Sequence, residues 1–396
     1  MSHNNQELIT RGISATYPSQ DFILSKMDKG QKLKIYLGID PTGATLHLGH
    51  AIQLKKLGEF QKAGHHVILL MGDFTAMIGD PTDKKATRKQ LTHQEVMANL
   101  KNYKKQAETF IKFTGPNKAE IKFNSKWLAK LNFTEILDLA SNMTVQQMLE
   151  RDMFQKRLNE GKPIYLHEFL YPLMQGYDSV AMDVDGEIGG NDQTFNMLCG
   201  RDLMKTLSQK EKFVITTKLL EDNTGKKMGK TEGNMVSLSD SPSDMYGKIM
   251  SWTDGLIPMG FELCTDMLQA QIDQIKKQLG DSMINPRDLK MKLAREIVQI
   301  YFGAKVAEVT EEAFIQTFQK KQIPEVIENI KAKETDLLVD ILLKHKIISS
   351  KTEFRRLVTS GAITLLDLNQ KVIDVNAVVM VGVYRIGKKR FIKISL

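Results

Sequence analysis

The sequence predicts an α/β fold with a parallel sheet, followed by an α-helical domain and a small α+β domain. A strand, a helix and a second strand follow one another within residues 34–71, which is the pattern of a βαβ unit. The apolar pattern turns helical at residue 243 and stays so to about residue 332. Residues 336–396 then combine two short helices with alternating strands. We therefore expect three domains, at 1–242, 243–332 and 336–396.

The first domain opens with the βαβ unit. Apolar strands are predicted at 34–39 and 66–71, with a helix at about 48–62 between them. Because such a crossover joins parallel strands, the unit predicts a parallel sheet.

A helical region interrupts this domain. Residues 90–160 are mostly helical by pattern, and further α/β segments follow at 165–235. The predicted helices are 94–114, 133–139 and 145–157. We expect a helical insertion at about 115–160 between two halves of the sheet.

The two C-terminal domains contain helix-start signals. Asn285 and Pro286 predict an N-cap followed by the first helical residue. In the last domain a helix is predicted at 336–345, and Ser350 with Glu353 has the capping-box pattern of a second helix. Gly361 can end that second helix. The predicted strands are 362–366, 371–375 and 390–394.

The composition is typical of a folded globular chain. Of 396 residues, 42% are hydrophobic and 26% are charged, which argues against a disordered ground state. No apolar run reaches the roughly 20 residues of a membrane helix, and the first residues do not resemble a secretory signal. The two cysteines, Cys199 and Cys264, lack CxxC spacing, so neither a disulfide framework nor a zinc site is expected. A cytoplasmic location fits these features.

The net charge of +8 is concentrated near the C-terminus. Residues 336–396 hold 11 Lys or Arg and 5 Asp or Glu, so +6 of the +8 lies there. A basic module on a nearly neutral body suggests a polyanionic partner. The alternative interpretation is a solvated, charged tail.

The first predicted strand ends in a polar run. Side chains alternate along a strand, so Tyr36, Gly38 and Asp40 share the face opposite the apolar residues 35, 37 and 39. Ligands of open α/β sheets bind at the carboxyl ends of strands, which is where this run lies. We therefore expect a binding site here.

Two further motifs suit phosphate groups. His47 and His50 lie at a predicted helix N-terminus, which favours anions, and Gly49 between them leaves room for a flat base. Residues 226–231 read Lys-Lys-Met-Gly-Lys-Thr and are bracketed by glycines, which suits a clamp on a polyphosphate. The alternatives are a helix cap with two surface histidines and a solvated lysine loop.

Three polar side chains share one face of a predicted helix. Tyr171, Gln175 and Asp178 stand at i, i+4 and i+7 in an otherwise apolar segment. A buried polar face without a ligand would leave donors and acceptors unpaired. The alternative is a structural hydrogen-bond network.

Together these motifs resemble those of the class I aminoacyl-tRNA synthetases. His-Leu-Gly-His at 47–50 is close to the HIGH motif, and Lys-Met-Gly-Lys-Thr at 227–231 is close to KMSKS. Leu48, Gly229 and Thr231 depart from those motifs conservatively.

Within that class, the chain resembles the bacterial tyrosyl-tRNA synthetases over nearly its whole length. The resemblance rests on Tyr-x-Gly-x-Asp-Pro-Thr at 36–42, Gly-Asp-Pro at 79–81, the polar helix face at 171–178 and Gly-Gly-Asn-Asp-Gln at 189–193. It implies a Rossmann-like catalytic domain with the helical insertion, then a helical anticodon-region domain and an S4-like RNA-binding domain at 336–396.

The resemblance implies a tyrosine pocket. A phenol needs a donor and an acceptor, which Tyr36 and Asp178 can supply, and acceptors for the substrate ammonium are expected from Asp80, Tyr171 and Gln175. The remaining expected pocket residues are Gly38, Asp40 and Gln193.

It also implies an ATP site. The residues expected at the phosphates are Thr42, His47, Lys84, Arg88, Lys227, Lys230 and Thr231. Gly49 and His50 are expected at the adenine and ribose, and Asp192 at a ribose hydroxyl. A solvated loop is the alternative for Lys84 and Arg88.

The implied reaction is that of a tyrosine–tRNA ligase, with tyrosine, ATP and tRNA(Tyr) as substrates. Mg²⁺ would accompany ATP, while no tightly bound cofactor and no protein-held metal are expected. The family implies a homodimer with the inserted helical region at its interface. An amphipathic stretch such as 133–148 is equally consistent with burial inside one protomer.

The basic residues of the last domain are expected to contact tRNA phosphates. They are Lys351, Arg355, Arg356, Lys388, Lys389 and Arg390. Lys290, Lys292 and Arg295 of the helical domain could join them, or form an ordinary solvated helix face.

Two other functions stay open at this point. A tryptophanyl-tRNA synthetase shares the fold and motifs but typically lacks such a C-terminal module. A non-catalytic or RNA-modifying protein with an S4 domain would explain the basic module, although the His-Leu-Gly-His and lysine motifs argue against it.

Overall fold

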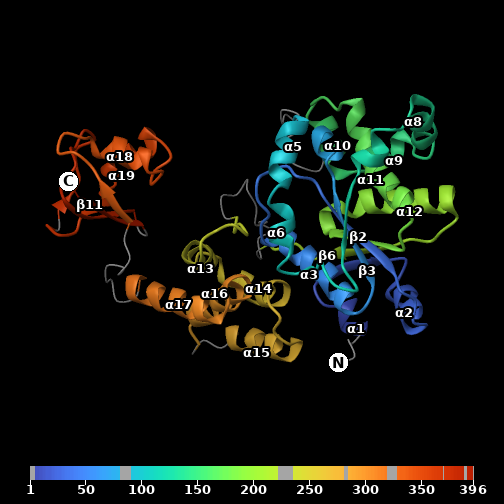
Figure 1. Cartoon of the computed structure of the whole chain (residues 1–396), viewed down its shortest axis with the longest axis horizontal. Coiled ribbons are helices and arrows are strands. Elements are labelled where there is room, and N and C mark those ends of the chain that lie inside the picture. Colours follow the sequence, from blue (N-terminus) through green and yellow to red (C-terminus); the bar gives the residue numbers. More distant parts are fainter. Residues whose placement is uncertain are drawn as a thin grey trace. The chain divides into compact units, whose positions relative to one another are not determined.

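The structure, a computed structural model of the chain, describes residues 5–80, 91–221, 235–280, 284–318, 328–368, 370–387 and 390–395. It divides into two units, residues 1–308 and 309–396 (Figure 1). The three-domain division stays a prediction.

A six-stranded sheet organises the first unit. Its strand order is β1-β6-β5-β2-β3-β4, and every neighbouring pair is parallel except β1 with β6. The strands are β1 Ile13–Tyr17, β2 Lys34–Ile39, β3 His66–Met71, β4 Glu120–Phe123, β5 Gly186–Gly190 and β6 Phe213–Thr217. The predicted strands at 34–39 and 66–71 are confirmed. The sheet is mixed rather than wholly parallel, because the N-terminal strand β1 runs antiparallel along the edge.

Helices cover both faces of this sheet. On one face, Leu54 and Phe60 of α3 pack with Ile35 and Leu37 of β2. On the other face, Met182 at the end of α11 packs with Tyr36 of β2, and α11 lies beside α12 (Figure 1). The helices of the sheet region are α1 Asn5–Leu8, α2 Gln20–Asp28, α3 Leu48–Lys62, α4 Thr75–Ile78, α5 His93–Leu100, α6 Tyr103–Ala107, α7 Ser125–Leu128, α11 Leu166–Met182 and α12 Thr194–Ser208.

The region expected as a helical insertion is only partly helical. Its short helices are α8 Phe133–Ala140, α9 Val145–Leu149 and α10 Asp152–Asn159. However, Glu120–Phe123 forms the edge strand β4, so the sheet extends into this region. The pattern hid β4 because an edge strand carries charged residues, here Glu120 and Lys122. The single helix predicted at 94–114 is divided into α5 and α6.

Helices follow the sheet region, as the sequence predicts. They are α13 Pro242–Met250, α14 Ile257–Cys264, α15 Gln269–Leu279, α16 Pro286–Phe302 and α17 Ala304–Phe318. The predicted cap of α16 is confirmed, since the Asn285 side chain accepts from the backbone N–H of Arg287. The prediction of a helix reaching about 332 is wrong at its end, because Glu328–Lys331 is strand β7.

The C-terminal unit holds a five-stranded sheet of order β7-β11-β10-β8-β9. Its elements after β7 are α18 Leu338–Lys344, α19 Lys351–Thr359, β8 Ile363–Leu365, β9 Gln370–Lys371, β10 Gly382–Ile386 and β11 Arg390–Ser395. Leu342 and Phe354 of the helices pack on Tyr384 and Ile392 of the sheet. This α+β unit agrees with the prediction, but the sequence analysis missed β7 and β10, and the strand expected at 371–375 is reduced to β9.

The helix starts in this unit are largely as predicted. The Ser350 side chain caps α19 by accepting from Glu353 N at 3.1 Å. The return contact of the Glu353 carboxylate goes to Ser349 rather than to Ser350. Among the described helices, none combines the length and apolar character needed to cross a membrane.

Candidate active site

Loops that follow the strands meet at one edge of the first sheet. Asp40 follows β2, Asp73 lies just after β3, and Asn191–Gln193 follow β5. The chain adds β3 and β4 on one side of β2, and β5 and β6 on the other. Ligands of open α/β sheets bind outside the carboxyl ends of strands where the strand order reverses in this way.

The face of β2 turned toward α11 is open near the carboxyl end of the strand. Gly38 is exposed although β2 lies inside the sheet, whereas Tyr36 beside it is fully buried. A Cβ atom on Gly38 would lie 3.9 Å from both Leu70 and Tyr36, in ordinary contact. The sequence prediction that Tyr36, Gly38 and Asp40 share a face is thus compatible with a small ligand over Gly38.

Asp40 is held by two hydroxyl groups. Thr75 Oγ1 donates to Oδ1 at 2.7 Å and Tyr171 OH donates to Oδ2 at 2.8 Å. Burial raises the pKa of Asp40 to about 7, helped by the charges of Asp80 and Asp73, while the two hydrogen bonds oppose the shift. Gly72 must be glycine at this close approach, because a Cβ there would overlap Asp40 Oδ1.

The polar face of α11 is buried, as the sequence predicts. Asp178 is 2% exposed and accepts from Trp127 Nε1 at 2.7 Å and from Asn124 Nδ2 at 3.2 Å. Burial raises the pKa of Asp178 well above its ordinary value. Gln175 donates to Glu187 at 3.1 Å. Each member of the face therefore has a protein partner and lies within one polar cluster.

Asp80 lies at the edge of this cluster and meets residues of the β5–α12 segment. It accepts from Gln193 Nε2 at 2.6 Å and from Asn196 Nδ2 at 3.5 Å. Arg151 Nη2 is 3.9 Å from Asp80, and the guanidinium lies 4.8 Å from the centre of the Phe195 ring. Within the described structure, both Nη atoms of Arg151 are buried without a hydrogen-bond partner. No pattern in the sequence indicated Arg151.

The two histidines cap α3 reciprocally. His47 Nδ1 accepts from Gly49 N at 3.1 Å, and His50 Nδ1 accepts from His47 N at 3.2 Å. A neutral imidazole that accepts at Nδ1 carries its proton on Nε2, so the outer nitrogen of each ring is a donor. A Cβ on Gly49 would come within 2.9 Å of the His47 ring. The helix-cap interpretation is therefore correct, and the caps present donors at a helix N-terminus, where anions bind.

Two other residues expected at ATP are exposed near the strand ends. Thr42 follows β2 in the loop before α3, and Asp192 follows β5. The remaining cations and the hydroxyl expected at the phosphates lie outside the described residues; they are Lys84, Arg88, Lys227, Lys230 and Thr231.

Sequence reasoning missed a buried chain of polar groups behind Tyr36. Lys212 Nζ donates to Ser179 Oγ at 2.8 Å and pairs with Glu187 Oε2, and Ser179 Oγ lies 2.9 Å from Tyr36 OH. The exposed fractions of Lys212, Glu187 and Ser179 are 0%, 2% and 0%. Lys212 follows a polar run at 209–211, so its sequence context indicated a solvated lysine.

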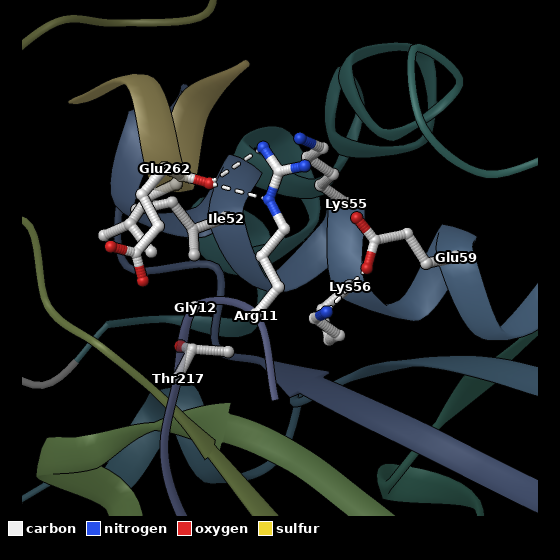
Figure 2. Close-up of a pocket in the computed structure, with 9 residues that line it drawn as sticks. Arg11, Gly12, Ile52, Lys55, Lys56, Glu59, Thr217 and Glu262 are labelled. Atoms are coloured by element: carbon white, nitrogen blue, oxygen red, sulfur yellow. Dashed lines mark hydrogen bonds and ion pairs between the residues drawn. The ribbon is translucent and has the colours of Figure 1, made fainter. Parts of the chain in front are cut away.

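A pocket elsewhere in the unit shares none of the expected site residues (Figure 2). Its lining charges are engaged with one another or with the backbone. Arg11 donates to the backbone oxygen of Glu262 at 3.3 Å, and Lys56 pairs with Glu59 at 2.6 Å. The Arg11 contact joins the segment before β1 to α14, and Lys56 also donates to the Leu8 carbonyl at 3.1 Å, which joins α3 to α1. These contacts have a structural role.

Comparison with known proteins identifies the family. A family model described as tRNA synthetases class I (W and Y) matches residues 28–319. The chain belongs to this family.

Curated relatives of this class I synthetase include a "Tyrosine--tRNA ligase" of Carboxydothermus hydrogenoformans, 42% identical, with 98% of this chain and 97% of the relative covered. "Tyrosine--tRNA ligase 2" of Clostridium acetobutylicum is 44% identical over 98% of this chain and 97% of its own. The "Tyrosine--tRNA ligase" of Thermotoga maritima is 42% identical, with 95% and 94% covered. The expected resemblance to tyrosyl-tRNA synthetases is confirmed.

Solved structures agree in fold. A truncated mitochondrial tyrosyl-tRNA synthetase of Aspergillus nidulans has a TM-score of 0.66 at 23% identity, covering 79% of this chain and 94% of that one. The tyrosyl-tRNA synthetase of Archaeoglobus fulgidus complexed with L-tyrosine has a TM-score of 0.61 at 20% identity, with 78% and 98% covered. At this identity the likeness concerns the fold alone.

Most of the basic residues expected in the synthetase's C-terminal unit are exposed. Lys351, Arg355 and Arg356 are exposed on α19, although Lys351 lies 3.2 Å from Asp340. The exposed Arg390 donates to the backbone oxygen of Ile347. Lys388 and Lys389 lie outside the described residues.

In the helical part, Lys290 is engaged and Lys292 and Arg295 are exposed. Lys290 Nζ donates to the Trp252 carbonyl at 2.6 Å and pairs with Asp254 at 2.7 Å. Lys290 therefore has structural partners of its own.

Proposed function

We propose that this chain is a tyrosine–tRNA ligase, which activates L-tyrosine with ATP to tyrosyl-adenylate and transfers the tyrosine to the 3′ end of tRNA(Tyr). One observation carries the proposal. The open face over Gly38 is flanked by the hydroxyl of Tyr36 and the carboxylate of Asp178 in a chain that shares 42–44% identity with tyrosine–tRNA ligases.

The pocket suits a phenol. Burial raises the pKa of Tyr36 most, and the charges of Glu187 and Asp178 raise it further. Tyr36 therefore keeps its proton and serves as donor, while Asp178 serves as acceptor. Phenylalanine would offer neither group a hydrogen-bond partner on binding, which is the reason for rejecting it. Tyrosyl-tRNA synthetases are themselves the established example of selection by a hydrogen-bonded hydroxyl.

The substrate ammonium is assigned to the acidic side of the same cluster. Burial raises the pKa of Tyr171, and the charges of Asp40 and Asp80 raise it further, so these three groups lie close together. Two amide side chains border this region: Gln175, which donates to Glu187, and Gln193, which donates to Asp80. An ammonium group placed here would meet carboxylate and hydroxyl oxygens.

The chemistry needs no protein nucleophile. The tyrosine carboxylate attacks the α-phosphate of ATP in line, and catalysis consists of positioning and of stabilising charge on the leaving pyrophosphate. His47 would donate from Nε2 to a phosphate, together with Thr42, Lys84, Arg88, Lys227, Lys230 and Thr231. His50 and Gly49 would border the adenine and ribose, and Asp192 a ribose hydroxyl.

Mg²⁺ is assigned to ATP rather than to the protein. Among the described residues, no three His, Cys, Asp or Glu side chains are grouped as metal ligands. Mg²⁺ is commonly held through substrate phosphates, so the mechanism proposed for this chain contains no step through a protein-bound metal.

The C-terminal unit is proposed to bind tRNA as an S4-like domain. Exposed Lys351, Arg355 and Arg356 on one helix would contact phosphates. Removing one of these charges should lower tRNA affinity and reduce its dependence on salt by about one unit of slope. Filter binding across a salt series measures this, and an unchanged slope would reassign the residue to solvent.

A homodimer is proposed through the region of α8 to α11. Large apolar side chains are exposed there, which monomeric proteins generally avoid in groups. They are Phe133, Leu137, Val145, Tyr165 and Leu166, with exposed fractions of 54–83%. Sedimentation of the wild type against Phe133→Asp tests this surface. The cytoplasmic location stays a prediction.

ATP–pyrophosphate exchange tests the main proposal. Exchange should depend on L-tyrosine and not on L-tryptophan, because an indole cannot replace the phenol hydroxyl between Tyr36 and Asp178. Stimulation of exchange by L-tryptophan alone would favour a tryptophanyl-tRNA synthetase instead.

A further inference from the structure

A buried ion pair stands directly behind the proposed phenol site. Lys212 at the start of β6 pairs with Glu187 on β5, with no solvent exposure of the ammonium group. Removing two charges from water is costly, and a buried pair is weak evidence for stability by itself. Only Ser179 separates Lys212 from the Tyr36 hydroxyl, which suggests a role in the site.

The space for this lysine is built into the fold. Gly200 of α12 has no side chain where a Cβ would lie 2.7 Å from Lys212 Nζ and 3.0 Å from Ser179 Oγ. Gly176 of α11 likewise approaches Gly200, with a would-be Cβ 3.1 Å from its N atom. The two helices therefore come close enough to bring Ser179 onto Lys212.

One hydrogen bond in this chain has a fixed direction, and the other follows from the partners that are present. Lys212 can only donate, so one lone pair of Ser179 Oγ is occupied. A second lone pair of Ser179 Oγ remains, so either hydroxyl could donate in the 2.9 Å contact with Tyr36 OH. In the described structure, Tyr36 OH is the other hydrogen-bond partner of Ser179 Oγ, so only the arrangement in which Ser179 donates gives the buried Ser179 hydrogen an acceptor. The Tyr36 hydrogen is then left for a third group.

Glu187 is the nearby acceptor that could compete for that hydrogen. After burial, its charge is the next cause of the raised pKa of Tyr36, and a hydrogen-bonding contact of the Tyr36 hydroxyl with Glu187 also contributes to the rise. However, Lys212 pairs with Oε2, and Gln175 donates to Oε1 at 3.1 Å. Lys212 thus neutralises the charge of Glu187 and also donates a hydrogen bond to Ser179 Oγ.

We propose that Lys212 is a positioning residue that acts through Ser179 and Glu187 to keep the Tyr36 hydroxyl hydrogen directed toward the substrate phenol, and so contributes to selection of tyrosine over phenylalanine. This inference rests on the proposed function and adds a residue set behind the pocket. Lys212 bridges Ser179 and Glu187. Without this ammonium group, the Ser179 hydrogen can turn toward the side chain at position 187; Ser179 can then accept the Tyr36 hydrogen, and the substrate oxygen loses its donor.

The test removes both charges together, so that no buried charge is stranded. Lys212→Met/Glu187→Gln should raise KM for tyrosine about tenfold in ATP–pyrophosphate exchange, the upper end for one neutral hydrogen bond, with kcat changed less than about twofold. The inhibition constant of phenylalanine, which lacks the hydroxyl, should stay within about twofold.

The matched control is Lys218→Met/Glu262→Gln, which removes a pair with a 2.7 Å contact at the far, partly exposed end of β6. It should leave both constants unchanged. If tyrosine KM and the phenylalanine constant rise equally in Lys212→Met/Glu187→Gln, or if neither changes, the orienting role is overturned. Exchange by the wild type with tyrosine tests the proposed function separately.

Ser179→Ala tests the same proposal in a chain that keeps its buried pair, in case the double variant does not fold. It removes the competing acceptor, so Tyr36 still donates to the substrate. Tyrosine KM should stay within about threefold of the wild-type value. The hydrogen bond from Ser179 polarises the Tyr36 hydroxyl, and its loss should weaken the bond from Tyr36 to the substrate by only about 10–30%. A tenfold rise would show that the assumed direction of the hydrogen bonds is wrong.

Discussion

Asp40→Asn should remove a pH dependence from the stability of the first unit. Burial raises the pKa of Asp40 from 3.8 to about 7 in the folded protein. The folded state therefore holds this proton between about pH 4 and 7, where the unfolded chain has released it. The free energy of unfolding then falls as the pH rises through this window and is flat above it.

The size of the effect follows from the shift. About three pKa units at roughly 1.4 kcal/mol each correspond to at most about 4 kcal/mol. Asparagine has no such proton, so the wild type should lose stability relative to Asp40→Asn by up to this amount between pH 4 and 7. A pH-independent offset is also expected, since the amide must replace one acceptor of Thr75 or Tyr171.

Urea unfolding followed by tryptophan fluorescence suits this measurement. Both tryptophans of the chain, Trp127 and Trp252, lie in residues 1–308, so the signal reports on the first unit. Asp202→Asn, at an exposed position of α12, is the control for the change in net charge. Parallel stability curves for the wild type and Asp40→Asn from pH 4 to 7 would refute the reasoning.

Three further outcomes are expected. Gly72→Ala should lower the urea midpoint by an amount equivalent to about 1–3 kcal/mol, because its Cβ would overlap Asp40 Oδ1; an unchanged midpoint would contradict this contact. His47→Ala should slow tyrosyl-adenylate formation in stopped-flow experiments far more than it weakens tyrosine affinity, and an unchanged rate would remove His47 from the phosphates. Asp178→Asn should raise the tyrosine Kd at least tenfold by equilibrium dialysis, as expected for a charge-assisted hydrogen bond of about 1.5–3 kcal/mol; normal affinity would exclude the phenol contact.

The elements around the site were predictable because their patterns are strong. The strands at 34–39 and 66–71 are continuous apolar runs, as expected for strands buried on both faces. The helix between them begins at a recognisable cap, His47. Tyr36, Asp40 and Asp178 could be selected since each interrupts an apolar pattern with a polar group.

The elements that were missed bury few residues. In β7 only Ile330 is buried, and a single apolar position cannot define a period. Edge strand β4 has no buried residue and alternates charged and apolar side chains over four positions. Such short segments become strands through pairing with β11 and β3, which is tertiary information.

The missed part of the site depends on contacts between distant segments. Glu187 and Lys212 stand 25 positions apart, and neither lies in a motif. Their pairing follows from the parallel register of β5 and β6 and from the space left by Gly200. A lysine next to a polar turn is usually solvated, so only the fold reveals this one as buried.

The described part of the site is rich in acidic groups, and burial raises the pKa of two of them, Asp40 and Asp178. Asp40, Asp178 and Glu187 are three acids of one polar cluster, and Lys212 balances Glu187. An incoming ammonium would favour ionisation of Asp40 and so offset part of the cost of burying that carboxylate. None of these acids can stabilise a phosphate group, so ATP requires cations from elsewhere. The motifs assign those cations to the segments at 84–88 and 227–231, which separates selection of the amino acid by the sheet and α11 from phosphate binding by loops.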